Sequence, residues 1–241
     1  MKNEKLSVLA ILLVIGAPAF FFLVFRPLSK IPRPPAPIHY YPEGVEKYKD
    51  ASGEEITDSV YHTIPNAEYQ MPSGDRFELD SLKGNVYVAN FFFASCPGIC
   101  PVMTNQLERV QQAFIKDRNF RIISMTVDPD RDSLEALRAY AKTHGAISGR
   151  WIFLRAPKEV TYKTAKDGFY LVAKEDEDGA EAFVHSEKLT LVDYNGVIRG
   201  YYDGTDSLQV NKLMQDLVLV LRETEKNYGF RKNPKERGKL W

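Results

Sequence analysis

The sequence has few of the residues that bind metals or cross-link chains. Its 241 residues include two cysteines, four histidines and two tryptophans. Two cysteines are too few for a disulfide-rich scaffold, so the fold has to rest on a hydrophobic core. Neither charge is in excess, because Lys+Arg and Asp+Glu both number 32, and this balance gives no support for a nucleic-acid partner. Internal repeats are also absent, which excludes a repeat architecture.

One long apolar run lies near the N-terminus. Leu6–Phe25 is twenty residues without a charge, and a helix of that length spans about 30 Å, the thickness of a bilayer's hydrocarbon core. The alternative is a cleaved signal peptide, because Ala17-Pro18-Ala19 resembles a cleavage site. The apolar run continues past that point, which favours an uncleaved, single transmembrane anchor over residues 1–26.

A proline-rich and polar stretch separates this anchor from the rest of the chain. Residues 27–42 carry six prolines, which predicts an extended, semi-rigid spacer. Residues 43–59 are polar and acidic and are expected to be irregular. We therefore expect a linker over 27–60, one domain over 61–225, and a basic tail over 226–241.

The order of predicted elements indicates an α/β fold. Tyr61–Tyr69 and Arg76–Leu79 flank a turn, which predicts an N-terminal β-hairpin. The pattern then predicts strands at Val86–Phe93, Phe120–Val127, Arg150–Leu154, Leu189–Val192 and Val197–Tyr202, and helices at Val102–Ile115, Leu134–His144, Lys158–Asp167 and Ser207–Thr224. The βαβ crossovers imply parallel strands with helices on both faces. A strand–cysteine–helix unit in this order is typical of a thioredoxin-like fold.

Both cysteines lie in one loop, Cys96-Pro97-Gly98-Ile99-Cys100-Pro101, between a buried strand and an amphipathic helix. A residue before proline disfavours the helical conformation, so we expect Cys100 just outside the helix and Pro101 at its first position. There the helix N-terminus would lower the thiol pKa, foremost that of Cys100. Two thiolates in this place suit either a reversible disulfide or a soft metal ion. An inert pair of buried thiols is the structural alternative.

Among the four histidines, His185 is the one expected to join the cysteines. It precedes the strand Leu189–Val192, in a loop that packs against the cysteine loop in a thioredoxin-like fold. Two thiolates and one imidazole would make a site suited to copper, whereas an ordinary loop histidine is the alternative. His39, His62 and His144 are expected to be structural, because exposure or charge pairing at a helix end explains them.

The cysteine loop resembles the Cys-Pro-x-x-Cys-Pro signature of the Sco/SenC family. The resemblance extends to Ser124–Asp132 (Ser-Met-Thr-Val-Asp-Pro-Asp-Arg-Asp), to Val184-His185-Ser186, and to the run from Leu191 to Gly196. Members of this family are membrane-anchored, thioredoxin-fold copper proteins that help to assemble the CuA centre of cytochrome c oxidase. The resemblance covers roughly residues 64–221 and includes the anchor.

This resemblance implies that Cys96, Cys100 and His185 are ligands of copper, Cu(I) or Cu(II). It also implies an acidic position near the site at Asp128. The implied partners are the CuA-bearing subunit of cytochrome c oxidase and a copper donor, with the domain of a single-pass membrane protein on the periplasmic or intermembrane-space side. Family members often carry an acid at the position of Gly98 and an Asp where Val184 stands, so this site has less negative charge.

These residues are compatible with two functions. A copper metallochaperone is favoured by His185, which a reductase does not need. A thiol-disulfide oxidoreductase would use Cys96 and Cys100 as redox-active thiols on a client protein. A peroxiredoxin-type peroxidase is disfavoured, because the chain lacks the Pro-x-x-x-Thr-x-x-Cys setting of a peroxidatic cysteine. In either favoured case we expect the two cysteines to form a disulfide in the oxidised, metal-free protein.

Overall fold

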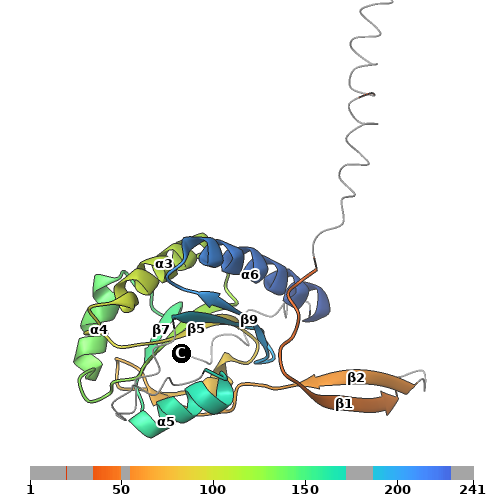
Figure 1. Ribbon diagram of the computed structural model, residues 1–241, viewed down its shortest axis with the longest axis horizontal. Helices are drawn as coiled ribbons and strands as arrows, with labels where there is room; N and C mark the ends of the chain where they lie inside the picture. Colours follow the sequence, from red (N-terminus) through yellow and green to blue (C-terminus); the bar gives the residue numbers. More distant parts are fainter. Residues whose placement is uncertain (1–19, 21–34, 50–54, 172–186, 229–241) are drawn as a thin grey trace, which may run out of the picture. The chain divides into compact units, whose positions relative to one another are not determined.

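A five-stranded mixed sheet forms the centre of the protein (Figure 1). The structure, a computed structural model, describes residues 20, 35–49, 55–171 and 187–228. The strands of the sheet lie in the order β7-β6-β5-β8-β9. Their bounds are Val86–Phe92 (β5), Phe120–Thr126 (β6), Trp151–Leu154 (β7), Lys188–Val192 (β8) and Ile198–Asp203 (β9). β5, β6 and β7 are parallel, whereas β8 is antiparallel to both β5 and β9, which confirms the predicted mixed α/β order.

The central strand β5 determines where the two cysteines are placed. All seven of its residues are buried, as expected for an apolar strand that is covered on both faces. It pairs with β6 from Val86 opposite Phe120 to Phe92 opposite Thr126. The carboxyl ends of β5 and β6 therefore meet at one edge of the sheet, and the cysteine loop leaves β5 at this edge.

Helices cover both faces of the sheet. They are α3 (Ile99–Ala113), α4 (Leu134–Thr143), α5 (Lys158–Lys163), which a π-helical turn at Thr164–Gly168 continues, and α6 (Ser207–Tyr228). α3 and α6 lie side by side on one face, and α5 lies on the opposite face (Figure 1). The hydroxyl of Ser133 accepts the backbone N–H of Ala136 at 3.1 Å, so Ser133 is the N-cap of α4.

The predicted N-terminal hairpin is present but shorter than expected. It consists of β3 (Glu68–Gln70) and β4 (Arg76–Glu78), followed by a 3-10 turn at Leu79–Leu82. Tyr69 and Phe77 face each other across the pair, and both are buried. The hairpin is joined to the segment after β7, because the backbone groups of Gln70 and Arg155 exchange two hydrogen bonds.

A second hairpin occupies residues 43–59, which the sequence predicts to be irregular. β1 (Pro42–Lys49) pairs antiparallel with β2 (Glu55–Tyr61), so that prediction is wrong. Polar composition indicated a loop here, but strand pairing uses backbone groups and tolerates exposed polar side chains, such as the ion pair between Lys47 and Glu55. The compact unit that holds the sheet begins at Ala36, so it includes residues 36–60 of the expected linker.

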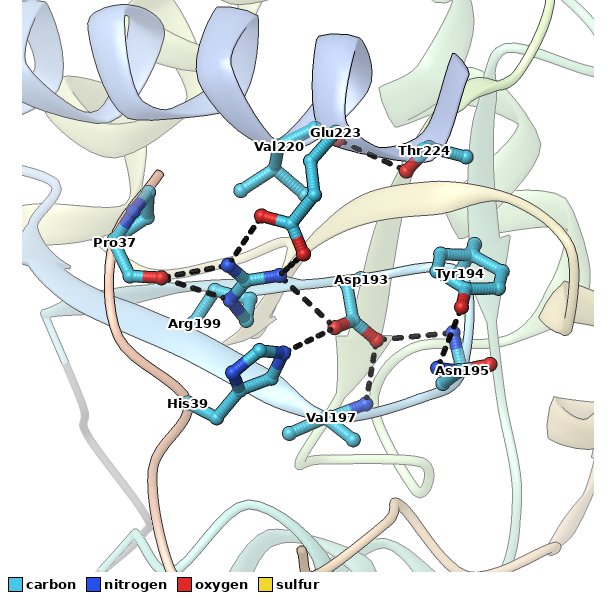
Figure 2. Close-up of polar contacts among 10 residues, drawn as sticks. All are labelled: Pro37, His39, Asp193, Tyr194, Asn195, Val197, Arg199, Val220, Glu223 and Thr224. Atoms are coloured by element: carbon cyan, nitrogen blue, oxygen red, sulfur yellow. Dashed lines mark hydrogen bonds and ion pairs between the residues drawn. The ribbon is translucent and has the colours of Figure 1, made fainter. Parts of the chain in front are cut away.

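A buried arginine fastens the start of this unit to the sheet (Figure 2). The side chain of Arg199, on β9, is 2% exposed and donates two hydrogen bonds to the carbonyl of Pro37, at 3.0 and 2.6 Å. It also donates to Asp193 at 3.2 Å and to both carboxylate oxygens of Glu223 on α6, at 3.1 and 2.8 Å. Nε2 of His39 lies 3.6 Å from the same Asp193 carboxylate. The chain is therefore held from Pro37 onward, where the sequence predicts part of a spacer.

Three sets of predictions fall on residues outside the described part of the chain. They concern the tail from residue 229, the loop residue His185 within 172–186, and the anchor Leu6–Phe25 apart from Phe20. Within the described part of the chain, no helix combines the length and the apolar character that a membrane crossing requires.

Candidate functional site

The two cysteines lie at the junction between β5 and α3. The backbone N–H of Cys96 donates to the carbonyl of Phe93 at 3.2 Å, which closes a tight turn directly after the strand. A side-chain carbon placed at Gly98 would lie 3.9 Å from the sulfur of Cys96, so this sulfur faces the start of the helix. Both side chains are buried, Cys96 at 8% exposure and Cys100 at 2%, and both thiols are free.

Cys100 lies inside the helix, which corrects the prediction that it precedes the helix. α3 begins at Ile99, so Cys100 is the second helical residue and Pro101 the third. The first four N–H groups of a helix have no partner within the helix, so a proline in the first turn removes no hydrogen bond. A residue before proline disfavours the helical conformation, yet Cys100 adopts it. The side chain of Cys100 is buried in this conformation.

The pKa values of the two thiols are shifted in opposite directions. Burial by itself raises the pKa of Cys96, but hydrogen bonds from the backbone and thiol of Cys100, and from the backbone of Gly98 and Ile99, lower it further than burial raises it. Burial raises the pKa of Cys100 to about 12, and the neighbouring Cys96 sulfur adds to this effect. The prediction that the helix N-terminus acts foremost on Cys100 is therefore wrong, because the free N–H groups point at Cys96.

A buried carboxylate supports the cysteine loop from behind. Oδ2 of Asp132 accepts the backbone N–H of Ala94, the second residue after β5, at 3.0 Å, and it also accepts the hydroxyl of Thr126 at the end of β6. Burial raises the pKa of Asp132, while these two hydrogen bonds favour its ionised form. Asp128, which the resemblance places near the site, forms an ion pair with Arg131, and its charge acts on Asp132.

Sequence reasoning missed this role of Asp132. The signal was available in the topology, because Asp132 follows β6 and the cysteine loop follows β5. The carboxyl ends of two adjacent parallel strands meet at one edge, so polar residues that follow them come together.

Aromatic side chains lie on the elements next to the cysteine loop. Phe93 is buried, and the guanidinium of Arg131 lies 5.6 Å from the centroid of its ring. The hydroxyls of Tyr140 and Thr104 form a hydrogen bond of 2.7 Å, which joins α4 to α3, and the Tyr140 ring lies 5.3 Å from that of Phe92. Burial raises the pKa of Tyr140, and the charges of Cys100 and Cys96 add to this shift, which places the tyrosine near the sulfur pair.

His185, the third predicted ligand, lies outside the described residues. Within the described residues, no group of three or more His, Cys, Asp or Glu side chains is arranged to hold a metal ion. The chain does re-enter the sheet at Lys188, the first residue of β8. Because β8 is antiparallel to β5, with Ala89 opposite Thr190, this first residue lies at the edge that carries the cysteine loop.

The other three histidines are held by carboxylates or backbone groups, as structural residues are. His62 lies between the Glu43 carboxylate and the carbonyl of Gly168, each at 3.0 Å. Nδ1 of His144, at the end of α4, lies 2.7 Å from the carboxylate of Glu108. His39 belongs to the network around Arg199.

Comparisons with known proteins agree on one family. A family model described as SCO1/SenC matches residues 64–221. The SCO1 protein homologue of Bacillus subtilis is 29% identical over 168 residues, which cover 68% of this chain and 86% of that protein. A protein of Stutzerimonas stutzeri named as copper-binding is 28% identical over 141 residues, covering 57% of this chain and 68% of its own length.

The solved structures agree as well. One of them is the structure of BsSco, which is described as a member of the Sco family of cytochrome c oxidase assembly proteins with a disulfide switch. It matches with a TM-score of 0.57 and 26% identity. The match covers 66% of this chain and 93% of that one. This likeness confirms the thioredoxin-like α/β fold of the Sco proteins for the present chain.

Proposed function

Because the chain belongs to the SCO1/SenC family, we propose that it is a copper-binding metallochaperone that assists assembly of the CuA centre of cytochrome c oxidase. The observation that carries this proposal is the pairing of two free thiols at the start of α3, with one thiol pKa lowered. The relative named as copper-binding and the family assignment support it. The partners would be the CuA-bearing subunit and a copper donor.

The donor atoms fit copper. Thiolates are soft ligands that suit Cu(I), and an imidazole adds the nitrogen that Cu(II) prefers. Cys96 and Cys100 would supply the sulfurs, and His185 would be the third ligand. Its place supports this role, because it stands three residues before Lys188, where β8 begins at the cysteine edge of the sheet. Both cysteine side chains are buried, which limits access of water to the sulfurs.

A second function is favoured by the opposite pKa shifts of the two thiols. A thiol-disulfide oxidoreductase needs one thiol that attacks the client disulfide and a second thiol that resolves the mixed disulfide. The Cys96 thiolate would attack a client disulfide and release one client thiolate. Cys100 would then lose its proton to solvent and attack the Cys96 sulfur, releasing the second client thiolate. The client is thereby reduced to a dithiol, and the Cys96–Cys100 pair is oxidised to a disulfide.

We also propose that Leu6–Phe25 is an uncleaved membrane anchor, with the domain on the periplasmic or intermembrane-space side. Its support is the charge-free length of the segment and the family resemblance. N-terminal sequencing of the native, membrane-extracted protein checks this proposal. A mature chain that begins near residue 20 would exclude an uncleaved anchor.

The test of the copper proposal compares wild type with His185→Ala, each titrated separately with Cu(I) and Cu(II). We expect the variant to lose tight Cu(II) binding and to retain most Cu(I) binding, because Cu(I) tolerates two thiolate ligands and Cu(II) prefers more ligands with nitrogen among them. His144→Ala is the matched control, because this histidine pairs with Glu108 and is expected to leave both affinities unchanged.

Reductase activity on a disulfide substrate is measured with the same proteins. If His185→Ala loses Cu(II) binding and keeps this activity, the two functions are separable and the metal-binding proposal stands. If copper binding in both oxidation states is unchanged, His185 is no ligand and the oxidoreductase function becomes the better proposal.

A further inference from the structure

The carboxylate of Asp132 is buried behind the cysteine loop, where the charge of Arg131 favours its ionised form and that of Asp128 opposes it. Its side chain comes from the segment between β6 and α4, and the residue is 1% exposed. A buried carboxylate is costly unless its environment favours the charge, so its retention here calls for a role.

One oxygen of this carboxylate joins three pieces of the site. Oδ2 accepts the N–H of Ala94, which fixes the direction in which the loop leaves β5. The same oxygen accepts the hydroxyl of Thr126, and that hydroxyl in turn accepts the backbone N–H of Asp128 at 3.1 Å. The cysteine loop is therefore tied to the end of β6 and to the start of α4 through a single atom.

The charge of this carboxylate also acts on the two sulfurs. Asp132 is among the charges that bear on Cys100. Two thiolates with Cu(I) carry one net negative charge, whereas two thiolates with Cu(II) are neutral. A fixed negative charge nearby repels the first arrangement and not the second.

We propose that Asp132 is a positioning residue that holds the cysteine loop in place and shifts the preference of the site from Cu(I) toward Cu(II). The charge part of this inference rests on the proposed copper function, and the positioning part does not. Asp132 is the carboxylate whose charge acts on Cys100, and the charge of Asp128 acts on Asp132.

Asp132→Asn separates the two parts of the proposal. Both donors converge on one oxygen, which an asparagine carbonyl can replace, so the variant keeps the hydrogen bonds and removes the charge. Asp132→Ala removes both. Asp130→Asn is the matched control, because Asp130 lies in the same loop and is exposed.

Two measurements are made on each protein. In the metal-free protein, we expect exchange of the Ala94 amide hydrogen to be unchanged in Asp132→Asn and at least about tenfold faster in Asp132→Ala. In the copper titrations, we expect the ratio of Cu(II) to Cu(I) affinity to fall about three- to tenfold in Asp132→Asn, the scale of an interaction between partly buried charges. Asp130→Asn is expected to leave the ratio within about twofold.

Two results would overturn the proposal. An unchanged affinity ratio in Asp132→Asn, or an equal change in Asp130→Asn, removes the charge role. An unchanged Ala94 exchange rate in Asp132→Ala removes the positioning role, and if that variant does not fold, the affinity ratio of Asp132→Asn decides alone. A wild-type protein that binds no copper would contradict the proposed function, while the amide-exchange comparison would still test the positioning.

Discussion

The two cysteines are only four positions apart in the sequence, but their surroundings differ. Cys96 receives N–H groups from the first turn of α3, whereas Cys100 is buried within that turn at 2% exposure. Since the thiolate is the reactive form, the two sulfurs are unequal before any metal or client arrives. In either proposed function, Cys96 is the sulfur that a partner would meet first.

We predict that an alkylating reagent modifies Cys96 well before Cys100 in the reduced, metal-free protein. The pKa of Cys96 is lowered and that of Cys100 is raised to about 12, so at neutral pH the thiolate is almost entirely on Cys96. Peptide mapping after short exposure to iodoacetamide measures the order, and we expect a rate ratio above about tenfold. The protein unfolded in urea is the control, in which the two rates should converge. Faster labelling of Cys100 would contradict the opposite shifts.

At the scale of elements, the segment before β1 is part of the fold and not a free spacer. The guanidinium of Arg199 bridges the Pro37 carbonyl, Asp193 and Glu223, so it ties the N-terminal segment, the β8–β9 turn and α6 together (Figure 2). Burial raises the pKa of Asp193, and Arg199 opposes this shift. Loss of the arginine would leave a buried carboxylate without its cation.

We predict that Arg199→Met lowers the free energy of unfolding by about 3–5 kcal/mol, the usual cost of removing one partner from a buried ion pair. Urea denaturation of the compact unit that begins at Ala36 measures it. Lys83→Met is the control, because Lys83 and Asp80 form an ion pair at 2.8 Å in which both side chains are exposed. We expect that variant to change the unfolding free energy by less than about 1 kcal/mol. Equal stability of Arg199→Met and wild type would refute a structural role for the network.

At the scale of the whole molecule, the core contains tyrosines whose hydroxyl groups are kept from water. Tyr87 lies on β5, and Tyr202, on β9, donates to Asp216 of α6 at 2.7 Å. Burial raises the pKa of both side chains well above the ordinary value. The packing between sheet and helices therefore includes groups that resist ionisation.

We predict that the folded protein loses stability above about pH 10, where tyrosines ionise in an unfolded chain. In that range the unfolded state releases phenolic protons that the folded state keeps on Tyr87 and Tyr202. The folded state then binds more protons, so its stability falls as the pH rises. Tyrosinate absorbance and the urea midpoint, both followed from about pH 9 upward, measure the effect. Uniform titration of all 13 tyrosines near the ordinary value, without loss of stability, would be the contrary result.

Much of the fold follows from local pattern. The apolar run of β5, the amphipathic α3 and the turn signal before β9 each lie within one or a few residues of the predicted bounds. The β1–β2 hairpin was not predictable in this way, because its residues are polar and its pairing depends on backbone groups. The attachment of Pro37 to Arg199 joins residues 162 positions apart, which no local pattern records.

The sequence by itself determined that both cysteines lie between a buried strand and a helix, and that the segment belongs to a thioredoxin-like α/β domain. Hydrophobic periodicity and the Pro-flanked cysteine spacing carry that information locally. The tertiary structure alone decided which thiol has the lowered pKa and that Asp132 supports the loop. Those properties depend on burial and on the contacts of N–H groups and carboxylates at the ends of β5 and β6. These contacts form only after the strands have paired.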